Sequence, residues 1–93
     1  MLNLQDKVAP NTEVVVTELD GEAVLLHLNT KMYYSLNPTG LCIWNMLADD
    51  TTLSEIGGRL QNRYELDTKN AEQSVLNLVN QLHSEQLVTR VGV

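Results

Sequence analysis

Three side chains of this 93-residue sequence could act as nucleophiles or metal ligands: Cys42, His27 and His83. A cysteine beside a histidine can form a nucleophilic site, and thiolate with imidazole can bind a transition metal. No paired-ligand spacing surrounds Cys42, which also falls in the first turn of a predicted helix, next to the helix's apolar stripe. We interpret Cys42 as an inert buried thiol, and we predict no catalytic residue, no metal site and no cofactor.

The composition limits the function further. Twelve acidic residues against six basic ones give a net charge of −6, the wrong sign for a nucleic-acid surface. No apolar run approaches the length of about 18 residues that spans a membrane, and the N-terminus has no signal-peptide core. A lone cysteine agrees with a reducing compartment. The sequence predicts one small cytoplasmic domain, without a membrane segment or nucleic-acid partner and too short for a separate catalytic domain.

The first half of the chain predicts a three-stranded antiparallel sheet. The predicted strands are Glu13–Leu19, Glu22–Leu28 and Met32–Leu36. Asp20-Gly21 is a strong signal for a two-residue hairpin turn, and a second turn at 29–31 reverses the chain again. Residues 1–12 read as a loose lead-in that could cover apolar surface.

Two registers are open for the second hairpin. A three-residue loop would pair Leu26 with Tyr34 and would form an apolar core face. That face would carry Val24, Leu26, Leu28, Met32, Tyr34 and Leu36. A two-residue loop would instead pair Leu25 with Tyr34. In the three-residue register the opposite face is also apolar, so we expect the lead-in, a second copy of the chain or a partner enzyme to cover it.

Helix signals begin directly after the third strand. Asn37 is typical of an N-cap, Pro38 fits the first helical position, and Leu36 with Leu41 occupies the positions of a hydrophobic staple. This first helix should reach about Ala48. Its predicted inward residues are Ile43, Trp44 and Leu47.

Two further helices are predicted. The second begins with the capping box formed by Thr52 and Glu55, and it contains Gly57-Gly58, where we expect a close contact with another helix. The third runs from Asp67 or Thr68 to about Gln86. It should bury Ala71, Val75, Leu78, Val79 and Leu82, whereas Leu76 lies off that stripe. The tail Leu87–Val93 could pack against the core or add a short strand.

The order of these elements, with the third strand leading into the first helix, resembles the PqqD-like family of leader-peptide recognition domains. The resemblance is carried by VVVTELDGEAVLLHLNTKMYYSLNPTGLCIW, TLSEIGGRLQNRY and VLNLVNQLHSEQLV. The tyrosine pair followed by Leu36-Asn37, Gly40 and Trp44 looks most like the stand-alone recognition proteins of lasso-peptide gene clusters. Lys31 departs from the family, since many relatives have glycine in this turn.

The resemblance implies a winged helix-turn-helix-like α+β fold over residues 13–93 and no catalysis. The leader of a ribosomally made precursor peptide would add as a strand to the edge of Met32–Leu36, in a groove closed by the third helix. The residues implied in binding are Met32, Tyr33, Tyr34, Ser35, Leu36, Leu76, Val79, Asn80 and His83. The implied partners are the leader, which typically carries an anchoring tyrosine and proline, and a leader peptidase, a cyclase or another modifying enzyme.

Two other functions share this fold class. A PqqD-type peptide chaperone would bind its peptide in the same way but would serve a radical enzyme in a redox-cofactor pathway. A winged-helix DNA-binding regulator is the third reading, although its second helix would offer only Arg59 and Arg63 to DNA.

Overall fold

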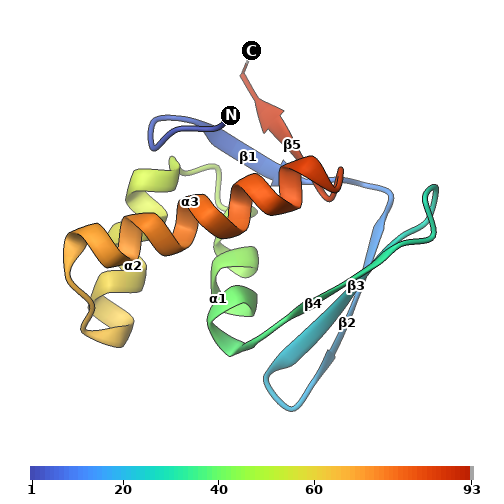
Figure 1. Ribbon diagram of the computed structural model, residues 1–93, viewed down its shortest axis with the longest axis horizontal. Coiled ribbons are helices and arrows are strands. Elements are labelled where there is room, and N and C mark those ends of the chain that lie inside the picture. Colours follow the sequence, from blue (N-terminus) through green and yellow to red (C-terminus); the bar gives the residue numbers. More distant parts are fainter. Residues whose placement is uncertain (93) are drawn as a thin grey trace.

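The computed structural model describes residues 1–92 as two small sheets and three helices (Figure 1). In chain order the elements are β1 (Lys7–Pro10), β2 (Val14–Leu19), β3 (Glu22–His27), β4 (Tyr33–Leu36), α1 (Pro38–Leu47), α2 (Leu53–Tyr64), α3 (Thr68–Ser84) and β5 (Val88–Val91). Strands β2, β3 and β4 form an antiparallel sheet in that order. The predicted α+β class, a three-stranded antiparallel sheet followed by three helices, is confirmed.

The register of the second hairpin differs from the three-residue expectation. Leu25 pairs with Tyr34 and Ala23 pairs with Leu36, so the pairing is the one that a two-residue loop would have given. The connection is nevertheless longer than two residues. The last bond between the two strands runs from the His27 N–H to the Met32 carbonyl (3.0 Å), and residues 28–31 form the turn between them. Lys31 within this connection is left-handed, with φ of 64°, at the position where relatives often have glycine.

This register changes which side chains of β3 face the core. Leu25 and Ala23 are buried, whereas Val24 and Leu28 are exposed, which reverses the expected assignment. A slip of one residue moves every side chain of a strand to the other face, so one error in loop length produced the whole reversal.

The outer face of the β2–β4 sheet carries uncovered apolar side chains. Val15 is 45% exposed, Val24 39% and Tyr33 70%. The lead-in does not cover this face, because its residues 7–10 pair elsewhere.

The lead-in is an ordered part of the fold. Strand β1 pairs antiparallel with β5, which confirms that the tail can add a short strand; Val93 lies outside the described residues. Leu2 and Val8 are buried in the core, and Arg90 forms an ion pair with Asp6 at 2.9 Å. The two ends of the described chain are therefore joined in one sheet (Figure 1).

The helix starts follow the predicted capping signals. Asn37 caps α1 by accepting the Gly40 N–H at 2.7 Å, with Pro38 at the first helical position. Thr52 and Glu55 form a complete capping box at α2, and Asp67 caps α3. Within residues 1–92, none of the helices has both the length and the apolar character of a membrane span.

The inward stripe of α3 agrees with the prediction at four of five positions. The buried residues are Ala71, Val75, Val79 and Leu82. Leu78 is only partly buried, as is Leu76, and both pack against the edge of the core. Leu78 therefore lies on a flank of α3 and not on its inward stripe.

The two adjacent glycines of α2 have different surroundings. A Cβ at Gly57 would lie 3.4 Å from Glu72 Cγ and 3.6 Å from Glu72 Cα, so α2 and α3 approach closely there, as expected. A Cβ at Gly58 would meet nothing within 4 Å. The helix runs unbroken through both positions.

Gly58→Ala should stabilise the protein by about 0.5–1 kcal/mol, because alanine favours an open helical position and reduces the entropy of the unfolded chain. Urea unfolding would measure this gain. Gly21→Ala is the matched control: Gly21 has φ of +79° in the β2–β3 turn, so the same substitution should cost about 1–2 kcal/mol. A loss of stability in Gly58→Ala would contradict the open environment of that glycine.

Candidate functional site

The free edge of β4 is the main candidate for a binding site. Residues 1–92 contain no strand paired with the side of β4 that faces away from β3. His27 and Met32 form a hydrogen-bonded pair, and such pairs alternate along an antiparallel ladder. The N–H and C=O groups of Tyr34 therefore point toward β3, and those of Tyr33 and Ser35 point outward. This edge offers two N–H donors and two carbonyl acceptors to an added strand.

The side chains of β4 divide between the two faces of the sheet. Tyr33 and Ser35 are exposed on the outer face, and Met32, just before the strand, is 59% exposed. Leu36 points into the core and is 2% exposed, so it supplies no side-chain surface for a ligand. Tyr34 lies on the core face but is only partly buried, at the rim of the sheet.

The N-terminal segment contacts α3 on the flank that was expected to line the groove. Asn80 Oδ1 accepts the Leu2 N–H at 2.8 Å, so this flank of α3 holds the N-terminal segment. Leu76, Asn80 and His83 share the flank, because helical spacing of four and seven residues puts them on one row. Figure 1 shows the N-terminus and β4 on opposite sides of α3 in this view.

Val79 is fully buried between the two flanks of α3. Val79 therefore offers no side-chain surface to a ligand, and the expected roles of Leu76, Asn80 and His83 in peptide binding stay predictions.

The other flank of α3 is the candidate to border the β4 edge, because the first flank meets the N-terminal segment. Leu78, Gln81 and Glu85 lie on it, at spacings of three and seven residues and across the buried stripe from Asn80. Burial raises the pKa of the Tyr34 phenol, and the negative charge of Glu85 raises that pKa further. The Asn11 side chain lies 3.4 Å from His27 Nε2 and donates to the Gln86 carbonyl at 2.8 Å, so the residues after α3 lie close to the β3–β4 hairpin.

The candidate site is therefore a strip between the β4 edge and the flank of α3 that carries Leu78, Gln81 and Glu85. The sequence named the β4 residues as candidates, gave no signal for Gln81 and Glu85, and placed Leu78 in the core, where the structure has it only partly buried. The missing signal was which flank of α3 turns toward the sheet. That orientation depends on contacts between distant segments, such as the one from Leu2 to Asn80.

The residues considered for chemistry do not form a second site. His27 is buried, and its Nδ1 accepts the backbone N–H groups of Asn29 (3.2 Å) and Thr30 (3.3 Å), so it shapes a turn. His83 is exposed on α3, and Cys42 is a partly buried free thiol on α1. No group of three metal-binding side chains occurs in the part of the chain that the structure describes.

The antiparallel sheet, whose β4 edge is unpaired within residues 1–92, and the three helices after it define a small α+β domain. The chain belongs to the PqqD family: the family model described as coenzyme PQQ synthesis protein D matches residues 22–88. No curated protein matches the chain.

Two solved structures are similar to this chain over most of its length. One is TbiB1 in complex with the TbiA(beta) leader peptide, with 29% identity and a TM-score of 0.79, covering 86% of this chain and 93% of that one. The other is lasso peptide synthetase B1 complexed with the leader peptide, with 25% identity and a TM-score of 0.80, covering 89% of this chain and 98% of that one. The fold and size of this domain therefore agree with those of two proteins solved with leader peptides.

Glu85→Gln should lower the pKa of Tyr34, because the substitution removes a negative charge that disfavours the phenolate. An NMR titration with tyrosine labelled at Cζ would measure the shift. Glu72→Gln is the control, since Glu72 lies on the other side of α3, against Gly57. An unchanged Tyr34 pKa in Glu85→Gln would show that this end of α3 does not face β4.

Proposed function

We propose that this protein binds the leader segment of a ribosomally made lasso-peptide precursor as an added strand on β4. The observation that carries the proposal is the outward backbone of Tyr33 and Ser35 on an unpaired edge. An extended peptide can satisfy these four groups, while its alternate side chains fill pockets on either face. The leader complexes of the two similar structures support this assignment.

The added strand would find side-chain contacts on the α3 side of the edge. Tyr34 and Leu78 are both partly buried and offer apolar surface there, and Glu85 adds a negative charge. The other edge strand of the sheet, β2, is exposed at five of its six residues, so a strand added there would find little neighbouring surface. We therefore place the leader along β4.

The protein would act by binding alone, without catalysis. It would hold the precursor and deliver it in the cytoplasm to a leader peptidase, a cyclase or another modifying enzyme. Binding raises the effective concentration of the precursor beside the enzyme, so a small domain can speed processing without chemistry of its own.

A second candidate is a peptide chaperone in a redox-cofactor pathway, which the description of the matching family model favours. The binding mechanism would be the same, and only the peptide would differ. Measuring affinity for both kinds of precursor would separate the two candidates. A DNA-binding role has less support, because the chain carries a net charge of −6.

Ser35→Pro should weaken leader binding by about tenfold or more while the domain stays folded, because proline removes one outward N–H that no internal bond uses. Isothermal titration calorimetry with a synthetic leader from the same gene cluster would measure the affinity. Ser35→Ala is the control, since it keeps the N–H and should bind normally.

Equal affinity of Ser35→Pro and wild type would mean that the leader binds elsewhere. Mass spectrometry of the recovered peptide tests the absence of catalysis, because cleavage or modification by the purified protein would contradict it.

Leu78→Ala should cost about 1–3 kcal/mol of leader binding, the amount expected for losing an apolar contact in the strip beside β4. Leu76→Ala is the matched control on the same helix, because Leu76 is also partly buried but lies on the flank that holds the N-terminal segment. The titrations should be made at a temperature where both variants are folded. If Leu76→Ala loses affinity and Leu78→Ala does not, the groove lies on the other flank of α3.

A further inference from the structure

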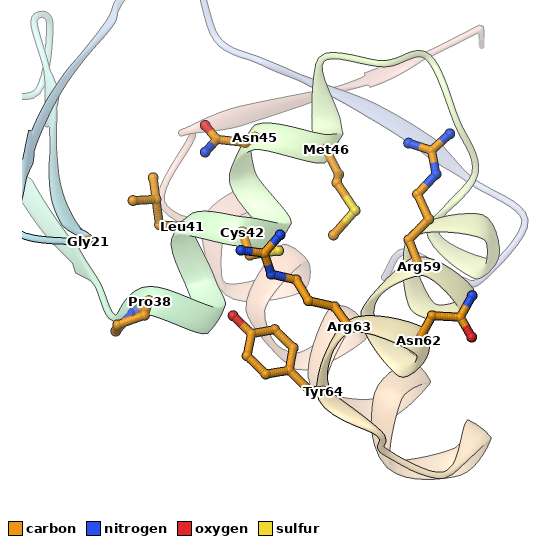
Figure 2. Close-up of a pocket in the computed structure, with 10 residues that line it drawn as sticks. All are labelled: Gly21, Pro38, Leu41, Cys42, Asn45, Met46, Arg59, Asn62, Arg63 and Tyr64. Carbon is orange, nitrogen blue, oxygen red and sulfur yellow. The ribbon is translucent and has the colours of Figure 1, made fainter.

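A second concave surface lies between α1 and α2, apart from the β4 edge. The hollow has a volume of about 710 Å³, and the β2–β3 turn closes one end of it at Gly21 (Figure 2). The residues that line it are Gly21, Pro38, Leu41, Cys42, Asn45, Met46, Arg59, Asn62, Arg63 and Tyr64. We call this surface the α1–α2 hollow.

The charge of the α1–α2 hollow is opposite to that of the whole protein. Two of the six basic residues of the chain, Arg59 and Arg63, line it, and none of the twelve acidic residues does. Arg59 donates to Asp49 at 3.0 Å. The Arg63 guanidinium lies 5.9 Å from the centre of the Tyr64 ring and forms no salt bridge within residues 1–92. Arg63 is therefore free to bind a carboxylate.

The surface of α1 in this hollow is apolar and adaptable. Leu41, Cys42 and Met46 come from α1, and Figure 2 shows the Met46 and Arg63 side chains extending from opposite helices into the same space. Methionine adapts its shape to a partner at low cost. The hollow thus combines a soft apolar wall with a cationic, hydrogen-bonding wall formed by α2.

We propose that the α1–α2 hollow docks an acidic segment of the leader peptidase that processes the bound precursor, with an apolar side chain of that segment against Met46 and a carboxylate on Arg63. This inference rests on the proposed leader-binding function. The hollow is an open groove with exposed arginines, which suits a chain segment better than a small ligand that needs enclosure. The arginines of the hollow would also attract an acidic segment, which the net negative charge of the rest of the protein would repel.

A second copy of this chain is a poor occupant. In a two-fold symmetric dimer the same surface meets itself, so two basic surfaces without a lining carboxylate would be brought together and repel. A head-to-tail contact would avoid that repulsion but would not close, and it would produce chains of molecules. The charge pattern therefore favours a different protein.

The hollow is placed where a docked enzyme would be close to the leader. Pro38, at one end of the hollow, is two residues beyond the end of β4. Helix α1 thus separates the two surfaces, and both can be occupied together.

Arg63→Glu tests the proposal in the full-length chain, with the purified leader peptidase of the same gene cluster as the probe. We expect Arg63→Glu to raise the Kd for the peptidase at least tenfold and to slow cleavage of the precursor, with leader affinity within twofold of wild type. Arg63→Gln should have a smaller effect, and the wild-type Kd should rise with salt. Lys69→Glu is the control: it makes the same charge change at an exposed position outside the hollow and should change neither affinity by more than twofold.

Four results would overturn the proposal. The first two are that the wild-type protein forms no complex with the peptidase and that Arg63→Glu leaves the peptidase affinity unchanged. The other two are that Arg63→Glu loses affinity for the leader and that the wild-type protein is a dimer which this substitution dissociates. Failure of the wild-type protein to bind the leader would instead refute the proposed function, and the leader titration alone reveals it.

Discussion

The sheet and its open edge depend on the buried imidazole of His27. Nδ1 of this ring accepts the N–H groups of Asn29 and Thr30, and the backbone of His27 bonds to both Lys31 and Met32. These four bonds set the length of the turn between β3 and β4. The turn length sets the register, and the register decides that Tyr33 and Ser35 direct their backbone groups away from β3. The candidate binding edge therefore depends on the turn that the backbone and the buried side chain of His27 hold together.

The same imidazole is also linked to the end of α3. His27 Nε2 lies 3.4 Å from the side-chain amide of Asn11, and that amide donates to the Gln86 carbonyl at 2.8 Å. The Asn11 N–H donates to the carbonyl of Leu87 at 3.0 Å. These contacts hold the start of β2, the β3–β4 turn and the residues after α3 against one another. The position of α3 beside β4, which the proposed groove requires, follows from them.

The sequence was informative where the determining interactions are local. Asn37, Thr52 and Asp67 each cap a helix with a side chain that reaches three residues along the chain, so the helix starts could be predicted closely. The register of β4 could not be predicted, because it depends on the His27 ring, which accepts backbone hydrogen bonds from the turn that follows it. The pairing of β1 with β5 joins opposite ends of the chain, and short strands of four residues give little periodic signal. The sequence cannot distinguish the two flanks of α3 for the same reason: each carries a partly buried leucine, and only contacts with distant segments, such as the one from Leu2 to Asn80, distinguish them.

The short length of β4 limits what its backbone can contribute to binding. Left-handed Lys31 precedes the strand and the Asn37 cap ends it, so only Tyr33 and Ser35 have outward backbone groups. Four hydrogen bonds at a net of about 0.5–1.5 kcal/mol each give roughly 2–6 kcal/mol, and micromolar affinity needs about 8 kcal/mol after the cost of association is met. Main-chain pairing alone is therefore too weak for a stable complex, which also protects the edge from pairing with unrelated strands. The remaining free energy must come from side chains beside the edge, so selectivity for the peptide is decided at Tyr34 and the facing flank of α3.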